Sequence, residues 1–81
     1  MKVHMLFFAQ LKDAFGESER VIETQNGVTI DQLVELLMND AYTSNWKFLP
    51  LRYAVNGKFE DGKTELRHGD TLALVPPVSG G

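Results

Sequence analysis

The chain has 81 residues, a formal net charge of −3 at pH 7 and no cysteine. This length predicts a single small domain, and the lack of cysteine excludes disulfides, thiolate metal sites and a cysteine nucleophile. The 8 lysines and arginines are scattered, which argues against nucleic acid or an anionic membrane as the main partner. The apolar runs are too short for a membrane span or a signal peptide, so we expect a cytoplasmic protein.

The N-terminal part of the chain predicts two strands joined by a helical turn. Residues 3–8 carry apolar side chains on both faces, which is typical of a central strand. Leu11 and Phe15 are four residues apart, as in a helical turn, and Gly16 ends that turn. An apolar pair within residues 19–24 predicts the second strand.

A helix follows, and its start is clearly marked. Thr29 is a candidate N-cap, and Gln32 three residues later completes a capping box. The apolar residues then recur at the spacing of one helix face: Ile30, Leu33, Val34 and Leu37. We expect the helix to end at residues 39–40. Residues 41–50 show no clear period and predict an irregular segment packed on the core.

Short strands and turns make up the remainder of the domain. Residues 53–55 and 58–60 read as strands joined by Asn56-Gly57, a pair suited to a hairpin turn with positive φ at both positions. Residues 71–75 form the last strand. This order predicts an α+β fold, a β-grasp with a mixed sheet and one main helix packed on one face. The first and last strands would then lie side by side in parallel.

The residues after the last strand predict an extended tail, residues 76–81, outside a domain of residues 1–75. Pro76 and Pro77 fix φ and remove two backbone donors, so the sheet ladder cannot continue through them. We expect the root of the tail to be stiff and to point away from the domain, with a reach of roughly 20 Å at most. Beyond the prolines the tail consists of Val78, Ser79, Gly80 and Gly81.

The Gly-Gly end is suited to insertion into another protein. Glycine has no Cβ, so this is the thinnest peptide that a narrow active site could accept. A carboxylate at Gly81 is a poor electrophile and would need activation, most simply as an acyl-adenylate. The sequence contains no P-loop, so we expect a partner to bind the ATP and to catalyse that step.

Three segments together resemble one known family. They are Phe7-Phe8-Ala9-Gln10 at the end of the first strand, Gly69-Asp70 before the last strand, and the tail of residues 76–81. In these segments the chain resembles the small, sulfur-carrier subunit of molybdopterin synthase, a ubiquitin-like β-grasp family. The resemblance covers essentially the whole chain, and the two ends carry most of its specificity.

The resemblance implies a pathway for sulfur in molybdenum cofactor biosynthesis. Gly81 would be adenylated by a ubiquitin-activating-enzyme-like partner and converted to a thiocarboxylate. The tail would then enter the large catalytic subunit and give its sulfur to cyclic pyranopterin monophosphate. The chain would be the sulfur-donating subunit of a sulfurtransferase heterotetramer, with two copies of each subunit, and not catalytic alone. It would bind no cofactor, and its lack of cysteine fits a sulfur carried on the main chain.

Strand alternation predicts an apolar docking patch at the root of the tail. If Leu74 faces the helix, Val75 faces outward, and the same alternation turns Phe8 outward. Phe59, after the hairpin turn, joins them. In the family that this chain resembles, the corresponding positions meet both the activating enzyme and the catalytic subunit, although Val75 is smaller than the aromatic residue expected there. The alternative is that Phe8 packs under residues 41–50.

Other polar residues suggest no further chemistry. Neither His4 nor His68 has a partner at the spacing of a metal site or a base–nucleophile pair, so we expect a surface residue and a turn residue. Arg52, Lys58 and Lys63 are expected at the rim of the patch, where salt bridges with a partner would set register more than affinity.

Three alternative functions remain open at this level. The chain could be a sulfur carrier of the thiazole pathway, although residues 7–10 and 76–77 favour the molybdopterin interpretation. It could be a ubiquitin-like modifier in which Gly81 forms an isopeptide bond to lysine. It could also be a plain β-grasp interaction module whose tail is idle, so that removing Gly80-Gly81 changes nothing measurable.

Overall fold

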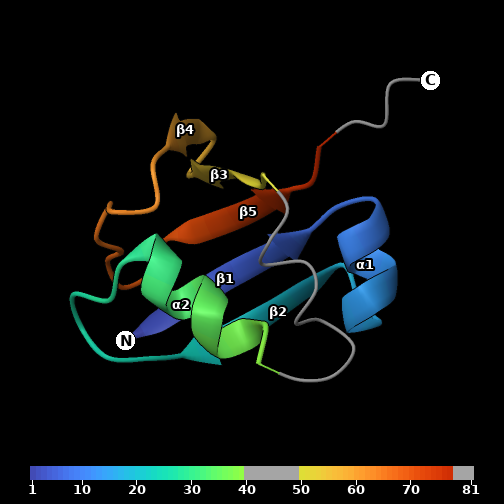
Figure 1. The fold of residues 1–81 in the computed structure, drawn as a ribbon. Coiled ribbons are helices and arrows are strands. Elements are labelled where there is room, and N and C mark those ends of the chain that lie inside the picture. The colour runs from blue at the N-terminus through green and yellow to red at the C-terminus, as the bar shows by residue number, and fades with distance from the viewer. Residues whose placement is uncertain (40–49, 78–81) are drawn as a thin grey trace.

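The computed structural model describes residues 1–39 and 50–77. Within them, five strands form one mixed sheet accompanied by two helices. In chain order the elements are β1 (Lys2–Phe7), α1 (Gln10–Phe15), β2 (Glu19–Glu23), α2 (Ile30–Leu37), β3 (Arg52–Val55), β4 (Lys58–Glu60) and β5 (Thr71–Val75). The strand order is β2-β1-β5-β3-β4, with β1 and β5 parallel and the other neighbours antiparallel (Figure 1). The predicted β-grasp fold and its parallel central pair are confirmed.

Local sequence signals define α2 and the β3–β4 hairpin as predicted. The Thr29 hydroxyl oxygen accepts from the Gln32 backbone N–H at 3.2 Å, and the Thr29 backbone N–H donates to Gln32 Oε1 at 3.0 Å. Asn56 and Gly57 have φ of 52° and 85°, the positive values that a type I′ turn needs. The helix ends at Leu37, earlier than expected, and the predicted irregular segment lies almost wholly outside the described residues.

The core lies between α2 and one face of the sheet. Figure 1 shows α2 across this face and no described helix across the other. The strands contribute the buried residues Val3, Met5, Phe7, Leu72 and Leu74, and the helix contributes Ile30, Leu33 and Val34. Among the described residues, no helix is long and apolar enough to cross a membrane. One face of the sheet therefore carries the core, and no helix of the described residues covers the other.

The first strand ends at Phe7, one residue before its predicted end at Phe8. Ala9 has φ 50° and ψ −126°, a positive-φ conformation that is uncommon for a residue with a Cβ. It turns the chain out of the ladder and into α1, where the Leu11 N–H donates to the Phe8 carbonyl at 3.0 Å. Phe8, which strand alternation was expected to turn outward, lies between β1 and Ala9 and is 47% exposed.

A close approach between Gly62 and Asp31 leads to a stability prediction. The Asp31 N–H donates to the Gly62 carbonyl at 2.9 Å, and a Cβ built on Gly62 would overlap the Asp31 carboxylate. Because the exposed Asp31 side chain can rotate away from the added methyl group, we expect Gly62→Ala to lower the free energy of unfolding by about 1 kcal/mol or less, measured by urea denaturation. In an Asp31→Ala background the same substitution should cost much less, because the overlapping atoms are gone. An equal loss in both backgrounds would contradict this explanation.

Candidate functional site

An apolar row crosses the face of the sheet opposite α2. Leu6 of β1 pairs with Ala73 of β5, and Ala73 pairs in turn with Ala54 of β3. Ala54 pairs with Phe59 of β4, so the four side chains form a line across four adjacent strands. Phe59 is 56% exposed, and the other three are half-buried. The name "apolar row" is used below for Leu6, Ala73, Ala54 and Phe59.

The predicted patch residues lie around this row. Val75 is two residues beyond Ala73 on β5, so it faces the same side of the sheet, and it is half-buried. Phe8 follows β1 and is 47% exposed. Phe8, Phe59 and Val75 therefore all keep accessible surface near the end of β5. Their contact with a partner stays a prediction, and the alternative packing of Phe8 involves residues that are mostly outside the described part of the chain.

Three members of the row were not among the predicted site residues. Leu6 could have been found from the sequence, because it alternates with the buried residues of β1. Ala54 and Ala73 carry no such signal, since alanine is common on either face of a sheet. Their place in the row follows from the register of β3 against β5, which only the structure gives.

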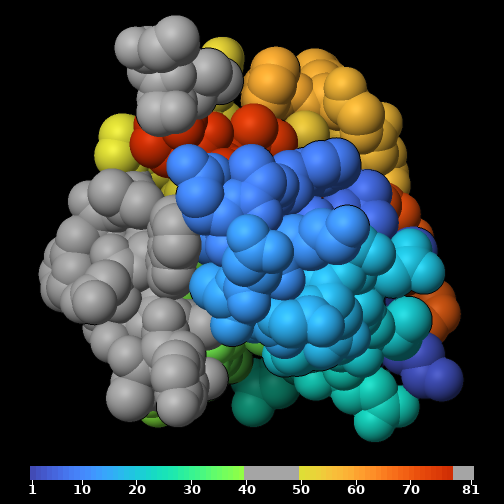
Figure 2. All heavy atoms as spheres, turned by 90° about the vertical axis from the view of Figure 1, so that its right-hand side faces the viewer, coloured from blue at the N-terminus to red at the C-terminus, as the bar shows by residue number. Residues whose placement is uncertain are grey.

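The root of the tail is packed against the domain. β5 ends at Val75, as predicted; Pro76 is buried and Pro77 is half-buried. Figure 2 shows the red end of β5 beside the blue segment that includes α1. Pro76 thus still packs against the domain, so the tail does not leave the domain directly after β5. Val78, Ser79, Gly80 and Gly81 lie outside the described residues, so the division at residue 75 stays a prediction.

Arg52 lies between the apolar row and the tail root. It pairs with Val75 in the sheet, and its guanidinium carbon is 4.3 Å from the centroid of the Phe59 ring. This is a cation–π contact that sequence reasoning did not foresee. Of the other predicted rim cations, Lys58 reaches Glu60 at 4.0 Å, and Lys63 is an exposed turn residue. Of these three cations, only Arg52 is therefore seen to contact a residue of the apolar row.

Each of the two histidines makes a polar contact with another described residue. His4 Nε2 is 3.3 Å from Glu19 Oε2, and His68 Nδ1 accepts from the Lys2 backbone N–H at 3.0 Å. They are a strand residue and a turn residue, as expected. In residues 1–39 and 50–77, no three His, Cys, Asp or Glu side chains lie close enough to hold a metal ion.

Tyr53 lies on the other side of the sheet from the apolar row, since its partner in the ladder is the buried Leu74. Burial, and then the charge of Asp31, raises the pKa of the Tyr53 phenol above 10.0. The phenol therefore stays neutral at pH 7, on the core side of the sheet.

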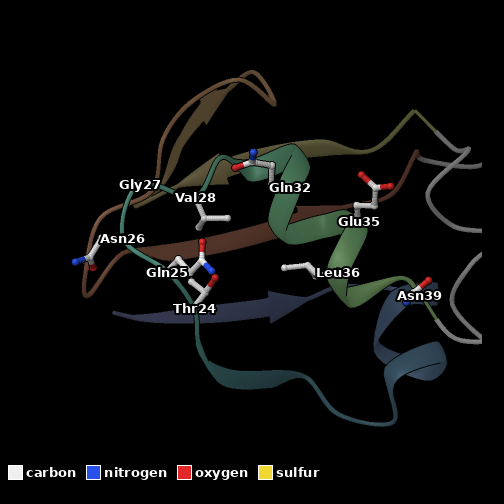
Figure 3. Close-up of a pocket in the computed structure, with 9 residues that line it drawn as sticks. All are labelled: Thr24, Gln25, Asn26, Gly27, Val28, Gln32, Glu35, Leu36 and Asn39. Atoms are coloured by element: carbon white, nitrogen blue, oxygen red, sulfur yellow. The ribbon is translucent and has the colours of Figure 1, made fainter.

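An open groove of about 580 Å³ lies beside α2, away from the apolar row. Figure 3 shows Leu36 pointing from the helix towards the segment of residues 24–28. The other lining side chains are mainly amides and a carboxylate: Gln25, Asn26, Gln32, Glu35 and Asn39. Because α2 and the sheet separate this groove from the tail root, it is not part of the candidate site.

Comparisons with known proteins agree with this geometry. The model of the ThiS family matches residues 5–81. A molybdopterin synthase sulfur carrier subunit of Mycobacterium tuberculosis is 32% identical over 82 residues, an alignment that covers 100% of this chain and 99% of the relative.

Two solved structures share the fold over nearly the whole chain. A putative molybdopterin converting factor, subunit 1, from Pyrococcus furiosus has a TM-score of 0.81 at 26% identity, covering 96% of this chain and 99% of that chain. A chain from the complex of subunits 1 and 2 of molybdopterin-converting factor from Helicobacter pylori has a TM-score of 0.71 at 27% identity, with both chains fully covered.

Proposed function

This chain belongs to the ThiS family, and we propose that it acts as the sulfur carrier subunit of molybdopterin synthase in molybdenum cofactor biosynthesis. The observation that carries the proposal is the continuity of the apolar row, through Val75, with the proline root of the tail. A partner that covers the row also receives the tail at a fixed position. The name of the 32% identical relative favours this function over the thiazole-pathway alternative.

The proposed chemistry takes place at the main-chain carboxylate of Gly81. In an activating partner, the carboxylate displaces pyrophosphate from ATP and forms an acyl-adenylate. A sulfur nucleophile then displaces AMP. Sulfide gives the thiocarboxylate directly, whereas a persulfide gives an acyl disulfide, which a second thiol cleaves to the thiocarboxylate while forming a disulfide with the donor. In the large subunit, the thiocarboxylate sulfur forms a bond to a carbon of cyclic pyranopterin monophosphate and displaces an oxygen substituent from it. Water then cleaves the acyl–sulfur bond, which leaves the sulfur on the pterin and restores the carboxylate of Gly81. The chain supplies no side-chain catalyst to these steps.

The contribution of the fold is to position this carrier group. β5 is hydrogen-bonded on both sides, to β1 and to β3, and Pro76 is buried at its end. The tail therefore begins at a point that moves little relative to the apolar row. From Pro76 onward, six residues reach at most roughly 20 Å, so docking and insertion into an active site are geometrically linked.

The large catalytic subunit is the proposed stable partner. The Helicobacter pylori structure, a complex of subunits 1 and 2, supports a partner of this kind. We expect the chain and its cognate large subunit to co-purify after co-expression and to elute together in size-exclusion chromatography, at a mass that fits two copies of each. Separate elution at micromolar concentrations would argue against this function.

A further inference from the structure

Arg52 places a positive charge on the face of the sheet that carries the apolar row, close to the tail root. It lies opposite Val75 in the β3–β5 pair and on the same face as Ala54 of the apolar row. Its paired neighbour Val75 and nearby Ala54 are apolar, and its guanidinium carbon lies 4.3 Å from the centroid of the exposed Phe59 ring. Asp61 lines the same surface hollow as Arg52 and forms no ion pair with it. Any protein that covers the apolar row must therefore also accommodate this cation.

The stacked guanidinium remains able to bind another group. The contact places the guanidinium carbon over the ring, and the group carries five N–H donors, none of which donates a hydrogen bond to a described residue. Stacking also restricts the side chain before a partner arrives, which lowers the entropy lost when it binds. This arrangement suits a planar acceptor that can take two parallel hydrogen bonds, as a carboxylate does.

No acidic side chain in the described part of the chain forms an ion pair with Arg52. Glu60 pairs with Tyr53 in the ladder, which places it on the other side of the sheet, and it is the acid nearest to Lys58. Asp61 follows β4, but its Oδ1 accepts from the Lys63 N–H at 2.8 Å. The only arginine ion pair described is Arg20 with Glu17, on a different part of the sheet.

We propose that Arg52 binds a carboxylate on the large catalytic subunit and thereby determines which proteins can dock on the apolar row. The inference rests on the proposed function and names a recognition residue for it. Burying an unpaired guanidinium is costly, so an apolar surface without a carboxylate at this point is rejected. The chain as a whole has a net charge of −3, so its overall field does not attract a carboxylate. Attraction of a partner's carboxylate therefore depends on the positive charge of Arg52 itself.

The test measures the affinity of the full-length chain for its large subunit by titration calorimetry at several salt concentrations. Arg52→Met removes the charge while keeping a long side chain, and Arg52→Glu reverses it. Arg67→Glu is the matched control, because Arg67 is exposed, forms no ion pair among the described residues, and precedes β5 at the end away from the tail root. Thermal unfolding of each variant alone checks the fold.

We expect Arg52→Glu to weaken binding at least about tenfold and Arg67→Glu to change it less than about twofold. Arg52→Met should also weaken binding, and its affinity should depend less on salt than that of the wild type. Wild-type affinity and salt dependence in Arg52→Met would overturn this inference while leaving the proposed function intact. A folded wild-type chain that does not bind the large subunit at all would overturn both.

Discussion

A chain that lacks Gly81 is expected to lose sulfur transfer completely while keeping its fold. The deletion moves the terminal carboxylate back by one residue, roughly 3.3–3.6 Å along an extended chain. Catalysis at a positioned group is very sensitive to displacements of this size, so the activating partner and the large subunit should both fail to use it. The measurement is molybdopterin formation in a reconstituted system containing both partners, the sulfur donor, ATP and the pterin precursor.

The matched control for this deletion is Gly81→Ala, which keeps the length of the tail and adds only a methyl group. We expect partial activity from it, since its carboxylate is in place but the tail is thicker. Circular dichroism should report the same folded domain for all three chains. Sulfur transfer by the deleted chain at the wild-type rate would rule out Gly81 as the reactive residue.

Replacing Phe59 by alanine is expected to cause the largest loss of docking among single substitutions on the apolar row. The ring is 56% exposed, and it supports the Arg52 guanidinium at 4.3 Å. Aromatic residues near the centre of an interface commonly contribute 2 kcal/mol or more, so we expect binding to the large subunit to weaken by about thirtyfold or more. Because the side chain lies outside the core, the free energy of unfolding should change little.

Leu36→Ala is the control for this effect. Leu36 is 68% exposed and lies on α2, which covers the core side of the sheet. Leu36→Ala therefore removes exposed apolar surface, as Phe59→Ala does, but at a site where no partner is proposed to bind. Calorimetry should give wild-type affinity for Leu36→Ala, and urea denaturation should give similar stabilities for both variants. Equal losses of affinity would show that binding depends on general surface hydrophobicity and not on the apolar row.

The parts of the fold that could be predicted are those determined by neighbouring residues. Thr29 and Gln32 form a capping box because both partners lie within one helical turn. Asn56-Gly57 forms its turn because these residue types tolerate positive φ. The alternation of apolar residues in β1 and β5 indicated two buried central strands. The order of the elements along the chain was then compatible with only a few sheet topologies.

The features that were missed depend on contacts between distant segments or on unusual backbone geometry. The alignment of Ala54 with Ala73 and the stacking of Arg52 on Phe59 follow from strand register, which the sequence does not specify for such short strands. Ala9 ends β1 with a positive φ that its residue type does not favour. These features nevertheless determine how the docking side is shaped, because they place Phe8, Arg52 and the apolar row around the end of β5.

Mass spectrometry of the intact chain can show whether Gly81 carries sulfur. The chain is incubated with ATP, the cognate activating enzyme and a sulfur donor, and samples without ATP serve as controls. We expect an ATP-dependent mass gain equal to the exchange of one oxygen for sulfur, located by fragmentation at Gly81. An unchanged mass, or a gain located on any other residue, would contradict it, and adducts through lysine would indicate a protein modifier instead.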